Sequence, residues 1–151
     1  MRDDVAKLFV DELRAAGFQV VRSVTVNREK EFIEQLLLNV TVGNEADAII
    51  LVGGSGIGPR DHACEVVDRL ANRRIEGFGE EYRRLLRGDD ESVVRVVLTR
   101  ATAGAYNGCL VVAMPRQTLG LVRRAVQQLL VPILPEAVRI ATGMGHSPES
   151  N

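Results

Sequence analysis

Two short apolar runs constrain the fold of this chain more than any other feature. Residues 48–52 read Ala-Ile-Ile-Leu-Val and residues 109–114 read Cys-Leu-Val-Val-Ala-Met, and neither run has a polar residue at every second position. A strand that is apolar on both faces has to be covered on both faces, as in the parallel sheets of α/β proteins. We therefore expect two core strands with helices on each side.

Over most of the remaining chain, apolar residues recur at the spacing of a helix. Residues 18–26 are rich in valine with partial alternation, which predicts another strand, whereas residues 92–100 fit either a strand or a helix. Helices alternating with apolar strands indicate an α/β fold with a largely parallel sheet. The helices are expected from Asp3 or Asp4 to Gly17, at 28–39, 63–71, 80–87 and 119–130, with an interruption or restart at Pro132 and Pro135 before 136–141.

Length and composition narrow the class of protein. The 151 residues suit a single domain over 1–142, followed by a flexible tail over 143–151. A net charge of −1 and the absence of Trp argue against a nucleic-acid partner. No segment reaches the roughly 18 apolar residues of a membrane span. Cys64 and Cys109 have no CxxC spacing, which favours buried thiols in a reducing cytoplasm. We therefore expect a cytoplasmic protein with a small-molecule ligand.

A glycine-rich loop follows the first apolar run. Residues 53–61 read Gly-Gly-Ser-Gly-Ile-Gly-Pro-Arg-Asp. Glycines allow positive φ angles, so consecutive amides can form a nest for a phosphate at the start of the next helix. Ser55 and Arg60 would add donors, and Asp61 would hold Mg²⁺ or position a nucleophile. The spacing fits equally well a tight turn in which Asp61 only caps the helix.

Four blocks in a fixed order carry a family resemblance. The glycine block with Pro-Arg-Asp is followed by Glu65, then by Ile-Glu-Gly-Phe-Gly-Glu at 75–80, Thr-Arg-Ala-Thr-Ala-Gly at 99–104, and the second apolar run ending in Pro115. Over about residues 4–141 the chain resembles the molybdopterin-binding domain of molybdenum-cofactor biosynthesis proteins of the MogA and MoaB type.

The resemblance implies a three-layer α/β/α domain that forms a homotrimer and binds molybdopterin. In active members of the family, AMP is transferred from ATP to the molybdopterin phosphate with Mg²⁺. Carried over to this chain, the resemblance makes Asp61 and Glu65 the candidate catalytic residues and Asp61 the candidate metal ligand. The candidate ligand-binding residues are Gly53, Gly54, Ser55, Gly56, Arg60, Arg100, Pro115 and Arg116.

Three departures from the family pattern bear on this chemistry. The family's first strand, which ends in a Ser-Asp motif, has no counterpart before the helix that begins near Asp3, so two strands would pair directly or leave a groove. Asn27 and Arg28 stand where the family has an acidic pair. Arg116 replaces a glycine of the second binding loop.

These departures leave three hypotheses for the function. The first is binding of molybdopterin in cofactor biosynthesis, with AMP transfer retained. The second is a degenerate paralogue that binds a pterin or nucleotide without turnover. The third is a hydrolase of ADP-ribose-type nucleotides in nicotinamide-nucleotide recycling.

Overall fold

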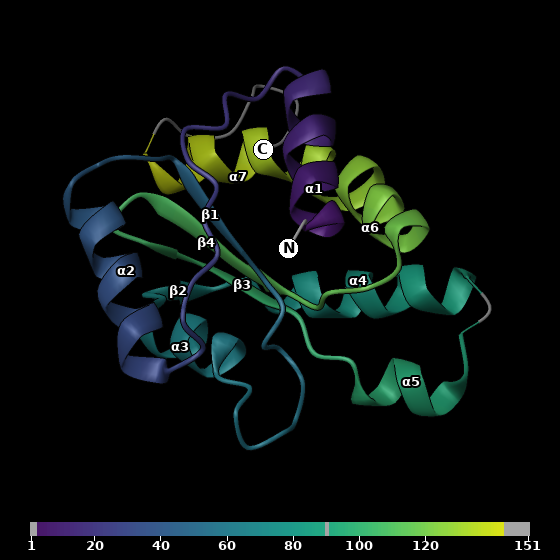
Figure 1. The fold of residues 1–151 in the computed structure, drawn as a ribbon. Coiled ribbons are helices and arrows are strands. Elements are labelled where there is room, and N and C mark those ends of the chain that lie inside the picture. The colour runs from purple at the N-terminus through teal and green to yellow at the C-terminus, as the bar shows by residue number, and fades with distance from the viewer. Residues whose placement is uncertain (1–2, 90, 144–151) are drawn as a thin grey trace.

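The computed structural model describes residues 3–89 and 91–143, in which a four-stranded sheet lies between helical layers (Figure 1). The sheet order is β1-β4-β3-β2. β1 pairs with β4 in parallel, and β3 is antiparallel to both β4 and β2, so β1, β4 and β2 run in the same direction. Both apolar runs are strands, as predicted. The strands are β1 (Ala48–Val52), β2 (Arg73–Arg74), β3 (Thr102–Tyr106) and β4 (Cys109–Met114).

Helices cover both faces of the sheet. Alternate residues of β4 belong to two separate cores, Leu110 and Val112 to one and Val111 and Ala113 to the other. The predicted three-layer arrangement is therefore confirmed. The first core lies against α1 (Asp4–Ala15), α4 (Glu76–Gly88), α6 (Leu119–Ala125) and α7 (Val131–Ala141), and the second against α2 (Lys30–Val42) and α3 (Ala63–Leu70).

The strand predicted at residues 18–26 does not form, and that prediction was wrong. These residues run beside β1 as irregular chain (Figure 1), with Val21 61% and Val24 57% exposed. A β-branched sequence becomes a strand only where a neighbour offers backbone groups to pair with. Among the described residues no strand precedes β1 and no backbone hydrogen bond joins this segment to it.

Other elements refine the sequence-based expectations. The ambiguous stretch at 92–100 is helical, as α5 (Val93–Leu98), and the Ser92 hydroxyl caps it by accepting from the Arg95 amide at 3.2 Å. The stretch from α6 to α7 is continuously helical through a π-helical turn, η1 (Val126–Leu130). The interruption expected at Pro132 and Pro135 does not occur, because Pro132 lies in the first turn of α7 directly after η1 and Pro135 lies inside α7. The tail predicted at 143–151 lies, beyond Gly143, outside the described residues.

None of the helices in the described ranges is both long enough and apolar enough to cross a membrane.

Candidate functional site

The glycine loop leaves the carboxyl end of β1, as predicted, and leads into α3. Gly53 and Gly54 have φ angles of 95° and 68°, a conformation that side chains disfavour. The Gly53 amide donates to the carbonyl of Met114 at 2.9 Å, and the Gly54 carbonyl accepts from the Ala63 amide at 2.9 Å. The loop is thereby tied to the end of β4 on one side and to the first turn of α3 on the other.

Arg100 clamps the same loop through its guanidinium group. Its Nε donates to the Ser55 carbonyl at 3.0 Å, and one terminal nitrogen donates to the carbonyl of Gly56. The guanidinium also forms a two-point pair with the Glu65 carboxylate, one contact of which measures 3.1 Å. This hydrogen bonding from Arg100 holds the pKa of Glu65 below its usual range. Arg100 and Glu65 therefore fix the shape of the loop, and Ser55, only 3% exposed, lies within it.

The carboxylate of Asp61 joins the glycine loop to the segment that precedes α2. Oδ2 accepts from the Gly58 amide at 3.0 Å, and Oδ1 accepts from Arg28 at 3.1 Å. A Cβ added at Gly56 would lie 2.7 Å from Oδ2, so a side chain there would displace the Asp61 carboxylate. Asp61 does not cap α3, because the residue at that position is His62 and no side chain caps the helix. The capping alternative is therefore wrong.

The loop after β4 meets the glycine loop beyond the carboxyl ends of the parallel strands β1 and β4. A Cβ added at Gly53 would lie 3.9 Å from the Cβ of Arg116. The Arg116 guanidinium donates at 3.0 Å to Asp3, which also accepts from the Ala6 amide at 3.0 Å as the N-cap of α1. The pKa of Asp3 is lowered, first by the bond from Ala6 and then by Arg116. Pro115 begins this loop and is half-buried.

A large groove opens at this edge and extends along β1. Its volume is about 1070 Å³, and it is lined by Gly53, Gly54, Arg60 and Arg116, among others. The other predicted site residues do not line it. Ser55, Gly56, Glu65 and Arg100 form the clamp, and Asp61 contacts the groove only through Arg28. Four of the ten predicted site residues therefore line the groove, whereas the other six, Pro115 among them, do not.

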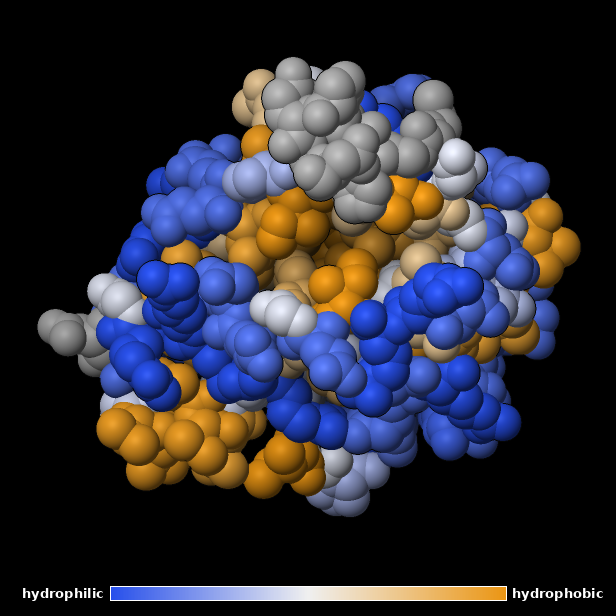
Figure 2. Space-filling view, turned by 180° about the vertical axis from the view of Figure 1, so that it is seen from behind, coloured by the Kyte–Doolittle hydropathy of each residue, from blue (hydrophilic) through white to orange (hydrophobic). Residues whose placement is uncertain are grey.

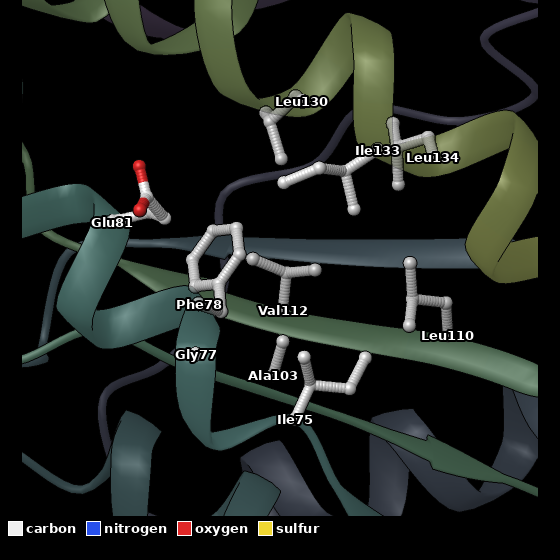
Figure 3. Close-up of a pocket in the computed structure, with 10 residues that line it drawn as sticks. All are labelled: Ile75, Gly77, Phe78, Glu81, Ala103, Leu110, Val112, Leu130, Ile133 and Leu134. Atoms are coloured by element: carbon white, nitrogen blue, oxygen red, sulfur yellow. The ribbon is translucent and has the colours of Figure 1, made fainter.

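A smaller hollow of about 300 Å³ lies elsewhere on the molecule. Figure 2 shows an apolar hollow in the face opposite to that of Figure 1. Four apolar side chains point toward one another in Figure 3. They are Phe78 of α4, Val112 of β4, Leu130 of η1 and Ile133 of α7. Among the described residues, Glu81 is the one charged side chain that lines this hollow, so the hollow offers little to hold a phosphate.

The comparisons with known proteins agree with this geometry. The family described as "Probable molybdopterin binding domain" matches residues 1–136. The chain belongs to this family. Molybdenum cofactor biosynthesis protein B of Bacillus subtilis (strain 168) is 31% identical over 137 residues, which are 91% of this chain and 79% of that protein.

Solved structures confirm the fold of this molybdopterin-binding domain. A crystal structure of molybdenum cofactor biosynthesis protein B superimposes with a TM-score of 0.83 and 29% identity, covering 96% of this chain and 91% of that one. The molybdopterin biosynthesis enzyme MoaB of Thermus thermophilus gives a TM-score of 0.78 and 26% identity, covering 97% and 89%. The resemblance stated from the sequence is therefore confirmed, and the chain's homologues are proteins of molybdenum cofactor biosynthesis.

A resident Mg²⁺ does not fit the site as it is built. No group of three or more His, Cys, Asp or Glu side chains that could hold a metal ion occurs in the described part of the chain. Asp61 stands alone, and both of its oxygens already accept hydrogen bonds, one of them from a cationic guanidinium. A cation there would have to displace Arg28. Mg²⁺ bound mainly by substrate phosphates would need only one or two carboxylates.

Two contacts of the domain escaped sequence reasoning. Arg28 was noted as a departure from the family, but its pairing with Asp61, 33 positions away, was not foreseen. Asp3 was expected only as a helix cap, whereas it also holds Arg116. The sequence held one indication of the first contact. Asn27 and Arg28 stand in place of an acidic pair of the family, which indicates that this segment contacts a different residue but does not identify that residue.

Cys64 and Cys109 are buried free thiols, as expected, and burial raises the pKa of each to about 11.

Proposed function

We propose that this domain binds molybdopterin in molybdenum cofactor biosynthesis, with the ligand's phosphate held at the glycine loop. The observation that carries the proposal is the pair of consecutive left-handed glycines, Gly53 and Gly54, at the carboxyl end of β1. Ligands of α/β sheets bind outside such strand ends. The Gly53 amide already donates to Met114, so the anion would be bound by the free amides of the turn that follows, from Gly54 onward.

Cationic side chains at the mouth of the loop support a phosphate as the group bound. Arg60 and Arg116 are both exposed and both line the groove. A guanidinium pairs with phosphate through two parallel hydrogen bonds, which a lysine cannot reproduce. The groove is larger than the small hollow behind the sheet and also more polar in its lining, so it is the better place for a charged ligand.

Calorimetric titration of the protein with molybdopterin tests the proposal. Gly53→Ala introduces a side chain at φ 95° beside Arg116, and we expect it to weaken binding about tenfold or more, which corresponds to about 1.4 kcal/mol. Gly17→Ala is the matched control, because Gly17 has φ 94°, open space around it and no part in the lining of the groove. It should incur similar backbone strain but keep its affinity.

Two results would count against this function. Equal loss of affinity in Gly53→Ala and Gly17→Ala would trace the effect to stability and not to the site. Turnover of ADP-ribose-type nucleotides without affinity for molybdopterin would favour the hydrolase hypothesis.

Transfer of AMP from ATP to the bound phosphate is a second candidate. A phosphate oxygen of molybdopterin would attack the α-phosphorus of ATP, and pyrophosphate would leave. The groove's volume of about 1070 Å³ is at the upper end of the range for small-molecule sites, which leaves room for a nucleotide beside the pterin. We assign Asp61 the role of the carboxylate nearest the reacting groups and Glu65 a positioning role through Arg100.

Pyrophosphate release in the presence of molybdopterin, ATP and Mg²⁺ measures this activity. Arg28→Ala would free one oxygen of Asp61, so a stronger dependence of turnover on Mg²⁺ is expected in that variant. Arg22→Ala removes a similar exposed ion pair, with Glu45, elsewhere along the groove and serves as control. Binding without pyrophosphate in either protein would select the degenerate paralogue.

We also propose that the domain forms a homotrimer. Four apolar side chains of α5 are exposed, with Val93 at 75%, and Figure 2 shows this patch at the lower left. Exposed apolar patches of this kind mark association surfaces. Sedimentation should show a trimer in the wild type and smaller species in a double variant with Val93→Lys and Val97→Lys, whereas a monomeric wild type would contradict the assembly.

A further inference from the structure

A cation lies beside Asp61 at a position where the family pattern has an acid. Arg28 donates through Nη2 to Oδ1 of Asp61 at 3.1 Å, although the two residues are 33 positions apart. Asn27 replaces the other member of the family's acidic pair. Its side chain is used locally, because Oδ1 accepts from the Glu29 amide at 2.8 Å in the turn before α2. The reversal of charge beside Asp61 therefore comes from Arg28.

The pair with Asp61 holds Arg28 in place and leaves it donors for a ligand. A guanidinium carries five N–H groups, and within the described residues a single hydrogen bond involves that of Arg28. The Arg28 side chain is 59% exposed, whereas that of Asp61 is 20% exposed and accepts from the Gly58 amide at 3.0 Å. Arg28 is thus anchored to the glycine loop with N–H groups that an anion can reach.

Two further arginines lie at the same loop. Arg60 directly precedes Asp61 and is exposed. The Cβ of Arg116 lies 3.9 Å from a Cβ built at Gly53. Each guanidinium can bind phosphate oxygens through two parallel hydrogen bonds. Together with Arg28 these side chains suit the several phosphate groups of a nucleoside triphosphate better than one phosphate group alone.

The charge of Arg28 equals that of an acid with a divalent cation bound to it. An ionised aspartate carries one negative charge and Mg²⁺ carries two positive charges, so together they present one positive charge to a phosphate, as an arginine does alone. Mg²⁺ in phosphate-binding sites is held by one or two carboxylates and by the phosphates themselves. Here the free side of the Asp61 carboxylate already pairs with Arg28.

We propose that Arg28 takes the place of Mg²⁺ in this site, so that the domain binds a nucleoside triphosphate without a divalent cation. The inference rests on the proposed function in one respect, namely that a phosphate ligand is bound at the glycine loop. Arg28 would donate to phosphate oxygens through the N–H groups that Asp61 leaves unused, and Asp61 would position it. The side chain at position 28 then decides whether binding needs a metal.

Calorimetric titration with ATP, in EDTA and in excess Mg²⁺, tests this role of Arg28. The wild type should bind ATP with dissociation constants that agree within about threefold in the two conditions. Arg28→Asp restores an acid beside Asp61, so it should bind about tenfold or more weakly in EDTA and regain most of this affinity in Mg²⁺. Arg28→Lys keeps the charge, so its binding should stay independent of Mg²⁺ but be weaker, because an ammonium group cannot form two parallel bonds.

Arg22→Asp is the matched control. It makes the same change of charge opposite another carboxylate, that of Glu45 at 3.3 Å, and should leave ATP binding independent of Mg²⁺. The inference is overturned if the wild type needs Mg²⁺ to bind ATP, if it binds no ATP in either condition, or if Arg28→Asp and Arg22→Asp behave alike. Failure to bind molybdopterin, with the ATP results as expected, would contradict the proposed ligand but not the role of Arg28.

Discussion

At the residue scale, Arg100 is the side chain that joins the most parts of the site. It holds two carbonyls of the glycine loop and the carboxylate of Glu65. Arg100→Ala should therefore loosen the loop and lower the affinity for molybdopterin about tenfold, with a loss of about 1 kcal/mol in the free energy of unfolding. Arg84→Ala, which removes an exposed pair with Glu81 within α4, should leave binding unchanged. Unchanged affinity in Arg100→Ala would show that the clamp is dispensable.

The same clamp predicts a dependence of stability on pH. The pKa of Glu65 is lowered from its usual 4.5, chiefly by the bonds from Arg100. Ionised Glu65 therefore stabilises the folded state above about pH 4.5, and this contribution is lost as the pH falls through the folded-state pKa. Urea unfolding of the wild type and Glu65→Gln should differ at pH 7 and converge at low pH. A constant difference across this range would refute the assignment.

Tyr82 supplies an independent check of the core. It is fully buried, and its hydroxyl has no hydrogen-bond partner within the described residues. Leaving such a group unsatisfied is costly, so Tyr82→Phe should raise the free energy of unfolding by about 1 kcal/mol, measured by urea denaturation. Tyr106→Phe, at a partly exposed position, should change it little. Destabilisation by Tyr82→Phe would mean that the hydroxyl has a partner.

Single residues also show what the sequence can and cannot predict. The positive φ angles of Gly53 and Gly54 were predictable, because a glycine-rich loop after a buried strand has few other uses. The clamp was not, since Arg100 and Ser55 are 45 positions apart and their contact depends on where α5 ends. Spacing along the chain does not fix such distant pairs.

At the element scale, β3 depends on a close approach that only glycine permits. A Cβ added at Gly104 would lie 2.5 Å from the Cβ of Ala71 and 2.9 Å from the Arg73 carbonyl oxygen. Gly104→Ala should therefore cost about 2 kcal/mol of stability by overpacking, measured by thermal or urea unfolding. Gly120→Ala, in α6 with open space around it, should instead be slightly stabilising. Equal effects of the two variants would contradict the packing.

Elements differ in how far the sequence predicts them. β1 and β4 were predictable from their uninterrupted apolar residues. β3 was not, because the centre of Thr-Ala-Gly-Ala-Tyr is Ala-Gly-Ala, whose small side chains have a weak strand preference, and β3 forms through its hairpin with β4. The strand predicted at residues 18–26 fails for the opposite reason. Its sequence suits a strand, but the described elements offer no neighbouring strand for it to pair with.

At the scale of the whole molecule, the order of the parallel strands sets the place of the site. β1 and β4 are neighbours running in the same direction, so the loops that follow Val52 and Met114 meet at one edge. The groove begins at that edge and continues along β1.

A crystal structure of the protein with molybdopterin tests the central claim most directly. We expect the ligand's phosphate within hydrogen-bonding distance of the Gly54 amide, because the Gly53 amide donates to Met114, with a guanidinium of Arg60 or Arg116 beside it. Molybdopterin found instead in the apolar hollow beside Phe78, with the glycine loop unoccupied, would contradict the claim.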